Sequence, residues 1–322
     1  MSQRDITSFF ARRVGPTAPP AAETAPRPRL FVDLFCGIGG ASAGAAAAGL
    51  EVVLAVDSWE YALNVHQQNH PSAQHVCTTL PPEEPLPMPT EPFHLHGSPP
   101  CTLVSKANRS TRTENELQEG LAMTRWFLNF ALSSTATTWS FEQVSTPELR
   151  HILREVRAAN RGRLDWDVFD VVQFGVPQHR KRIVAGTSEL IAKLRRTRRP
   201  RRCVRDVVPN PRGTHIKNES YWMYSGAENR HNRKKVGKDD GCRPISKPCY
   251  TILKKALRWS TPNTDTPLLR LKGFEAALLQ GFPPDYVLPT SNHRTLIATG
   301  NALPPQVMEC MLSVRDPHSS SP

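Results

Sequence analysis

Cys101 is a candidate nucleophile because of the segment that carries it. It directly follows two prolines in His96-Gly97-Ser98-Pro99-Pro100-Cys101, after a short apolar run at 92–95. Consecutive prolines fix φ and stiffen the chain, so the thiol is carried on a rigid, extended loop. Cysteine is a highly nucleophilic side chain near neutral pH and serves in covalent catalysis. A lone cysteine is more often a small buried hydrophobe, so this segment alone indicates chemistry only weakly.

A glycine-rich turn and a later carboxylate predict a nucleoside site. The turn is Asp33-Leu34-Phe35-Cys36-Gly37-Ile38-Gly39-Gly40, and Asp57 follows Gly37 by 20 residues at the end of the next apolar run. Glycines allow close backbone approach to a ligand, and a carboxylate at that place can accept hydrogen bonds from a ribose. The full G-x-G-x-x-G spacing is missing. The pattern therefore favours an adenosine cofactor without a pyrophosphate.

Two further groups fall where strands are expected to end. Glu142 ends the segment 138–142, on the same predicted sheet edge as Cys101. Gln178, Arg180 and Arg182 share one strand face by the two-residue period and could clamp a base and a phosphate. Taken alone, Glu142 would also fit a solvated strand end. The set of Gln178, Arg180 and Arg182, taken alone, is more often an ordinary exposed strand face.

These groups need a scaffold of alternating strands and helices. Strands are expected at 30–35, 52–56, 93–96 and 138–142, and helices up to 50 and at 61–69 and 116–132. The alternation predicts an α/β fold with a doubly wound, Rossmann-like parallel sheet. The expected organisation is a peptide at 1–10, a Pro/Ala-rich disordered linker at 11–29, a catalytic domain at 30–189, a small second domain at 190–290, a segment at 291–315 that returns to the catalytic domain, and a tail at 316–322.

The composition favours a polyanionic partner in a reducing compartment. The chain has 41 Lys and Arg against 29 Asp and Glu, a formal net charge of +12 and a pI near 9.7. This charge favours nucleic acid as the first candidate partner and an anionic membrane as the second. No apolar run is long enough to span a bilayer, and no signal peptide is expected. The 7 cysteines include no C-x-x-C pair, so we expect an intracellular protein with neither a disulfide framework nor a metal site.

Taken in order, these segments resemble the cytosine-5 DNA methyltransferases over roughly residues 30–314. The glycine turn is similar to the family's first S-adenosylmethionine motif, and Gly97-Ser98-Pro99-Pro100-Cys101 to its nucleophile loop. Phe141-Glu142-Gln143-Val144 stands where the family has Glu-Asn-Val. Four later segments resemble further motifs: Gly175–Arg182, Arg243–Ile252, Gln280–Pro283 and Gly300–Pro304.

The resemblance implies roles for these residues. Cys101 would add to carbon 6 of a flipped cytosine, Glu142 would act on ring nitrogen 3, and Arg180 and Arg182 would hold the base and the intermediate. S-adenosylmethionine would lie against Asp33, Phe35, Gly37, Ile38, Gly39, Asp57, Ser58, Pro100, Asn301 and Ala302. Double-stranded DNA would meet Ser105, Lys106, Arg109, Gln178, Arg230 and Arg233.

The sequence departs from the family pattern at several places. Gln143 replaces the asparagine that braces the nucleophile loop, Thr102 replaces the usual glutamine, and Ser58 stands where an aromatic residue often stacks on adenine. The third strand, near Cys77, lacks the usual aspartate. The cluster Arg195–Arg202 is typical of a phosphate grip or a nuclear import signal, but equally of a solvated loop.

The N-terminal peptide resembles the motif that docks on the sliding clamp PCNA. Gln3, Ile6, Phe9 and Phe10 match its four key positions, and one helical turn would place the apolar three on one side. The resemblance implies a nuclear protein, or one at a viral replication site, and we expect a monomer. Two alternatives are methylation of tRNA and a catalytically weak, clamp-bound DNA-binding protein.

Overall fold

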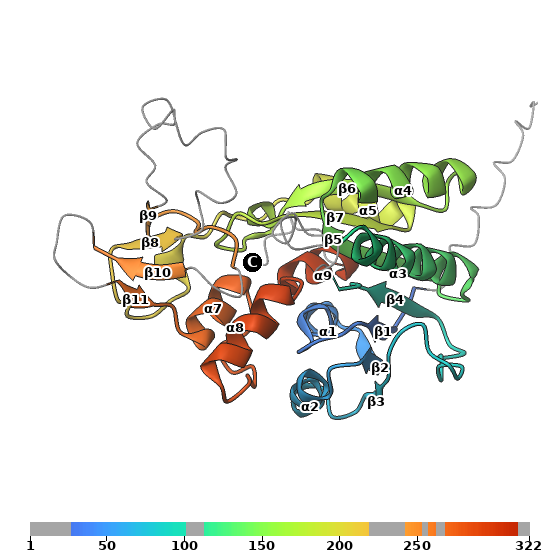
Figure 1. The fold of residues 1–322 in the computed structure, drawn as a ribbon, viewed down its shortest axis with the longest axis horizontal. Coiled ribbons are helices and arrows are strands. Elements are labelled where there is room, and N and C mark those ends of the chain that lie inside the picture. Colours follow the sequence, from blue (N-terminus) through green and yellow to red (C-terminus); the bar gives the residue numbers. More distant parts are fainter. Residues whose placement is uncertain (1–26, 101–112, 219–241, 253–256, 262–267, 315–322) are drawn as a thin grey trace, which may run out of the picture.

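The computed structural model describes residues 27–100, 113–218, 242–252, 257–261 and 268–314 (Figure 1). Its large sheet has the order β3-β2-β1-β4-β5-β7-β6. The strands are β1 (Leu30–Leu34), β2 (Glu51–Asp57), β3 (Gln74–Cys77), β4 (Phe93–Gly97), β5 (Thr138–Val144), β6 (Asp165–Asp170) and β7 (Lys181–Gly186).

The expected α/β doubly wound class is confirmed, but the sheet is mixed rather than wholly parallel. Strand β7 runs antiparallel to both β5 and β6, whereas the other neighbours are parallel. The reason lies in the connection between β6 and β7. It contains only the short 3-10 turn η2 (Val171–Phe174) and no crossover helix, and parallel neighbours need a longer crossover.

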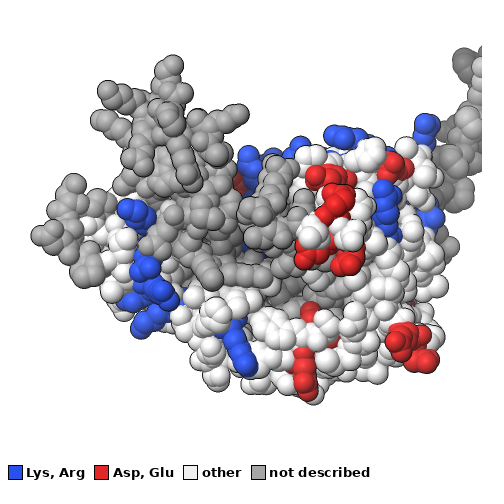
Figure 2. Space-filling model, in the orientation of Figure 1, with Lys and Arg blue, Asp and Glu red and all other residues white. Residues whose placement is uncertain are grey.

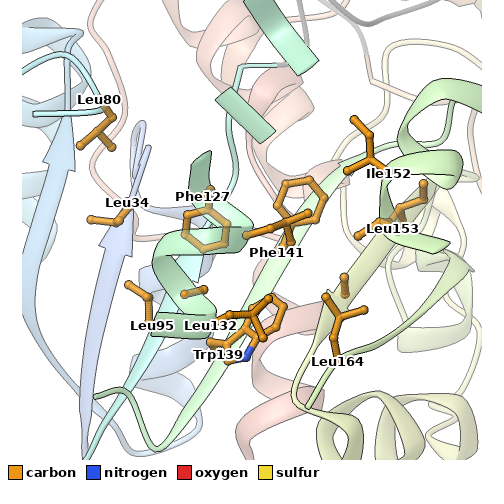
Figure 3. Close-up of a cluster of buried hydrophobic side chains, with 14 of the residues drawn as sticks. Leu34, Leu80, Leu95, Phe127, Leu132, Trp139, Phe141, Ile152, Leu153 and Leu164 are labelled. Carbon is orange, nitrogen blue, oxygen red and sulfur yellow. The ribbon is translucent and has the colours of Figure 1, made fainter. Parts of the chain in front are cut away.

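Helices cover both faces of the sheet. Helices α3 (Glu114–Ser133) and α4 (Pro147–Ala159) pack on one face, and α1 (Gly40–Ala47), α2 (Glu60–Asn69), α5 (Ser188–Arg196) and α9 (Pro305–Leu312) on the other. Figure 3 shows the first core, where Phe127 of α3 stacks near Phe141 of β5 with ring centroids 6.0 Å apart. Both rings are fully buried. Burial of one such side chain stabilises the fold by about 1.5–3 kcal/mol.

The alanine-rich sequence of α1 is explained by its contact with α9. Ala41 and Ala45 share a buried cluster with Val307 and Met308. A Cβ atom placed on Gly44 would lie 2.1 Å from the carbonyl oxygen of Pro305, so only glycine fits there. Small residues on α1 therefore let the C-terminal helix approach closely. The segment after Pro304 packs on the large sheet, as the sequence predicted, while α1 ends at Ala47 rather than at 50.

A second, antiparallel sheet has the order β11-β10-β8-β9. It consists of β8 (His215–Asn218), β9 (Cys242–Pro244), β10 (Leu257–Ser260) and β11 (Leu269–Arg270), and it packs with α7 (Gly273–Gln280). Helix α8 (Asn292–Asn301) follows. The predicted boundary at 190 needs correction, because Ile191 and Leu194 are fully buried in the core of the large sheet. No helix of the described ranges has the length and apolarity to cross a membrane.

Candidate active site

A cavity of about 240 Å³ opens where β1, β2, β4 and β5 end. It brings together most of the described residues that the sequence predicted for the cofactor and for catalysis. These are Phe35, Gly37, Ile38, Asp57, Ser58, Pro100, Asn301 and Ala302 for the cofactor, and Glu142, Arg180 and Arg182 for catalysis. A second hollow, between α3 and α4, is lined by none of them.

The glycine turn and Asp57 form one wall of this cavity. The Asp57 carboxylate accepts a hydrogen bond from the backbone N–H of Gly37 at 2.8 Å and another from that of Trp59 at 2.8 Å. Gly37 has φ +50°, and a Cβ atom there would meet no atom within 4 Å, so the turn presents open backbone. Burial raises the pKa of Asp57, against these two hydrogen bonds. The carboxylate keeps free lone pairs for ligand hydroxyls.

Asp33 and Gly39 were predicted to touch the cofactor, but neither residue lines the cavity. The fully buried Asp33 carboxylate accepts a hydrogen bond from Ser42 Oγ at 2.6 Å, and Ser42 Oγ lies 2.9 Å from His66 Nε2. Burial raises the pKa of Asp33 to about 7. A Cβ atom on Gly39 would lie 2.5 Å from the Tyr286 hydroxyl. Both residues therefore help to fix the conformation of the turn.

Glu142 and Arg182 form a shielded ion pair that also lines the cavity. Arg182 Nε lies 3.0 Å from Glu142 Oε1, and the two side chains are 12% and 6% exposed. They sit diagonally on one sheet face, since Val144 of β5 pairs with Arg182 of β7. Burial raises the pKa of Glu142, and the charges of Arg182 and Arg180 oppose the rise. The site therefore holds a carboxyl group that is easier to protonate than a solvated one.

Arg180 and Gln178 join the catalytic domain to the C-terminal segment. The fully buried Arg180 donates to the carbonyl oxygens of Gly300 at 3.0 Å and Ala302 at 3.2 Å. Gln178 donates to the carbonyl oxygen of Leu279 at 3.1 Å and to Gln280 Oε1 at 2.7 Å. Gln178 has 0% exposed surface, so its predicted DNA contact is wrong for this structure. The physical reason is that its side-chain amide is buried and hydrogen-bonded to Leu279 and Gln280.

Gln143 still braces the loop that leads to Cys101, despite its extra methylene group. Its Nε2 donates to the carbonyl oxygen of Pro99 at 2.6 Å, and its Oε1 accepts from the N–H of Val144 at 2.8 Å. The side chain is 2% exposed. The departure from asparagine therefore keeps a donor to the nucleophile segment.

The cavity residues that were given no site role from the sequence include Trp59, Ser98 and Leu303. Ser98 donates to the carbonyl oxygen of Phe35 at 3.3 Å and thereby ties the nucleophile segment to the glycine turn. The signal for Trp59 was its place beside Ser58, where an aromatic residue was expected. The signal for Leu303 was its place in the motif-like segment Gly300–Pro304, directly after Asn301 and Ala302.

Several predicted site residues lie outside the described ranges and remain predictions. They are Cys101, Ser105, Lys106, Arg109, Arg230 and Arg233, and Gln3, Ile6, Phe9 and Phe10 of the N-terminal peptide. Among the described residues, no group of three His, Cys, Asp or Glu side chains is placed to hold a metal ion.

The sheet order, the glycine turn over β1 and the carboxylate after β2 define a Rossmann-like methyltransferase of the S-adenosylmethionine-dependent class. A solved structure described as a DNA modification methyltransferase from an E. coli prophage has this fold. Its TM-score is 0.58 at 18% identity, covering 88% of this chain and 97% of that one. The family model for C-5 cytosine-specific DNA methylase matches residues 30–125.

Two curated relatives from Herpetosiphon aurantiacus agree with that match. Type II methyltransferase M.HgiGI is 34% identical over 101 residues, covering 31% of this chain and 75% of the relative. Type II methyltransferase M.HgiDI is 33% identical over 159 residues, covering 47% of this chain and 49% of the relative, so the chain spans about half of its length. The chain belongs to the C-5 cytosine-specific DNA methylase family, and this membership implies S-adenosylmethionine as the methyl donor.

The residues of the cavity fit that cofactor. The open backbone at Gly37 and the Asp57 carboxylate suit a ribose and a methionine-like chain, while Phe35, Trp59 and the prolines supply apolar walls. Asn301 and Ala302 bring the C-terminal segment to the same cavity.

Proposed function

We propose that this protein transfers a methyl group from S-adenosylmethionine to carbon 5 of cytosine in double-stranded DNA. One observation carries the proposal. The paired Glu142 and Arg182 face the same cavity as the glycine turn and as Pro100, the residue directly before Cys101 in the chain. An acid, a cofactor turn and a nucleophile segment thus border one space, which is the arrangement that a meeting of base and cofactor requires.

Cys101 acts as the nucleophile in this proposal. Its thiolate adds to carbon 6 of the cytosine, and the new S–C bond makes carbon 5 electron-rich. S-adenosylmethionine, when bound, supplies an electrophilic methyl group. Loss of the carbon-5 proton and cleavage of the S–C bond then restore the ring and the thiolate. Gln143 supports this step because its hydrogen bond to Pro99 fixes the chain two residues before the thiol.

Glu142 supplies the acid. A carboxyl group with a raised pKa can donate its proton to ring nitrogen 3, where negative charge develops as the thiolate adds. Arg182, bonded to the same carboxyl group, orients it toward the cavity. Arg180 acts indirectly. Its hydrogen bonds to the carbonyl oxygens of Gly300 and Ala302 hold Asn301, which lies between them, at the cofactor cavity.

The charge of the small domain favours a polyanionic substrate. Among the described residues of 197–290, Lys and Arg outnumber the acidic residues Asp206, Asp285 and the buried Glu275. In Figure 2, Lys and Arg side chains lie over β8, β10 and β11, where no Asp or Glu is visible. Phosphate contacts supply much of the affinity of DNA-binding proteins. A stacked cytosine cannot reach an enclosed site, so the base must be flipped out at a cost of a few kcal/mol.

The arginine-rich segment contributes less to this charge than its sequence suggests. Arg195 forms ion pairs with Asp165 and Asp167, and Arg199 forms one with Glu309 at 2.8 Å. These two side chains therefore serve the fold. The exposed arginines of this segment are Arg196, Arg198, Arg201 and Arg202.

The proposal includes binding to the sliding clamp, and this part rests on the sequence match of the N-terminal peptide. Gln3, Ile6, Phe9 and Phe10 would dock a monomeric enzyme on PCNA, in a nucleus or at a viral replication site. Replacing Phe9 and Phe10 by Ala should abolish co-purification with PCNA and leave methylation of short oligonucleotides intact. Loss of methylation together with docking would contradict a separate docking role.

The central experiment measures transfer of a radiolabelled methyl group to duplex DNA and to tRNA in parallel. We expect transfer to DNA, and Cys101→Ser should abolish both transfer and covalent trapping on DNA that contains 5-fluorocytosine. Transfer to tRNA alone would show that the substrate is tRNA rather than DNA. Full activity of the Ser variant would refute the nucleophile. DNA binding without transfer would favour the catalytically weak DNA-binding protein, which the retained Gln143 brace argues against.

A further inference from the structure

Three side chains from two distant segments form a stack beside the cavity. The rings of Trp59 and Tyr61 lie 6.1 Å apart at an interplanar angle of 29°. The guanidinium carbon of Arg294, in the first turn of α8, lies 4.1 Å from the centre of the Tyr61 ring. This is well within the range of a cation–π contact.

The stack connects two parts of the cavity lining, the start of α2 and helix α8. Trp59 lines the cavity from the start of α2, and Ala298 and Asn301 line it from α8. Arg294, Ala298 and Asn301 follow each other at spacings of four and three residues, so they lie along one stripe of the helix. A contact at Arg294 therefore sets the position of the same helix face that reaches the cavity.

Tyr61 holds the beginning of α8 in two ways. Its side chain interacts with Thr290, directly before the N-cap residue Ser291, and its ring contacts the Arg294 guanidinium. The Thr290 hydrogen bond and the nearby Arg294 charge lower the pKa of Tyr61. Among the residues that the structure describes, no carboxylate forms an ion pair with Arg294. The aromatic ring is therefore the contact that places this cation.

The apolar surroundings make the stack a firm connection. Ile38 of the glycine turn, Ala62 and Val65 of α2 and Ala298 of α8 share one buried cluster, against which Trp59 and Tyr61 pack. A shift of α8 would therefore move the turn, Trp59 and Asn301 relative to one another.

We propose that Arg294 is a positioning residue of the cofactor site, which by stacking on Tyr61 holds Trp59 and α8 in place at the cofactor cavity. This rests on the proposed function, because it takes the cavity as the S-adenosylmethionine site. Arg294 itself touches no reacting atom. It raises cofactor affinity by fixing both walls before binding, which lowers the ordering cost of the complex.

The test is the dissociation constant of S-adenosylhomocysteine for the full chain, measured by titration calorimetry. Arg294→Ala should weaken binding about two- to fivefold, the range of an exposed cation–π contact. Arg294→Lys keeps the charge but lacks the planar guanidinium group, so its dissociation constant should lie between those of wild type and Arg294→Ala. Arg154→Ala removes an exposed arginine from α4, on the other face of the sheet, and serves as the matched control with unchanged affinity.

A double-mutant cycle separates positioning from general damage. If Arg294 acts through the stack, Arg294→Ala should add little once Tyr61→Ala has removed the ring on which Arg294 stacks. The affinity for duplex DNA without cofactor should stay the same. An unchanged dissociation constant for Arg294→Ala, or fully additive effects of the two substitutions, would overturn the proposal. If wild type fails to bind the ligand at all, the cofactor site itself fails, and the proposal with it.

Discussion

The hydrogen bond from Gln143 to Pro99 is expected to control both stability and catalysis. Gln143→Ala removes a donor 2.6 Å from the Pro99 oxygen and an acceptor 2.8 Å from the Val144 N–H. The Pro99 oxygen and the Val144 N–H would each lose a partner, which costs about 1–3 kcal/mol per group, so the free energy of unfolding should fall by about 2–6 kcal/mol. Urea unfolding measures this as a lower midpoint with an unchanged slope.

The catalytic effect should exceed what the loss of stability explains. Pro99 lies two residues before Cys101, and a misplacement of about 1 Å can cost about 100-fold in rate. We therefore expect methyl transfer at saturating substrates to fall about 10- to 100-fold under conditions where the variant is still folded. Covalent trapping on 5-fluorocytosine DNA should slow in parallel.

Two further variants sharpen this experiment. Gln143→Asn shortens the side chain by one methylene group, so the bond to Pro99 should weaken and the rate should fall below wild type. Gln118→Ala removes an exposed glutamine from α3, bonded there to Glu114, and should change stability by less than about 0.5 kcal/mol. Unchanged stability and rate for Gln143→Ala would refute the reasoning.

The same geometry makes three other substitutions informative. Glu142→Gln should slow transfer about 10²- to 10⁴-fold. Because only the protonated carboxyl group donates, wild-type activity should fall as pH rises through the raised pKa of Glu142, and a pH–rate profile of the Gln variant should lack that limb. Gly44→Val should lower the free energy of unfolding by at least about 2 kcal/mol in urea, since even a Cβ atom would overlap Pro305, whereas the exposed Ala46→Val should be mild. Asp57→Ala should weaken S-adenosylhomocysteine binding at least about tenfold by calorimetry, because hydrogen bonds to a charged group stabilise by about 1.5–3 kcal/mol; equal affinity would place the ribose elsewhere.

The sequence predicted the parts of the site that are set locally. A glycine turn after an apolar run and acidic residues at strand ends are consequences of the parallel α/β arrangement, whose strand ends meet at one edge. Asp57 and Glu142 could therefore be expected at one edge of the sheet from the residue pattern alone, and both line the cavity there. The small residues of α1 pointed to a helix, although not to its partner α9.

The sequence failed where contacts join distant segments. The two-residue period assigned Gln178 to an exposed strand face, but β7 begins only at Lys181, and the preceding residues turn into the domain junction. The partners of Gln178 and Arg180 lie 72 to 122 residues further along the chain, and no local period encodes them. The antiparallel β7 was missed for a related reason, since strand direction depends on a connection that carries little pattern of its own.

The close contact between α1 and α9 has a consequence for how the protein is made. The family-matching segment at 30–125 leaves the ribosome long before Asn301 and Ala302, which line the pocket, and before α9, which packs against Gly44. A nascent or truncated chain that stops before residue 300 would possess the glycine turn but lack one wall of the pocket. We therefore expect binding of the methyl donor to follow the synthesis and packing of α9.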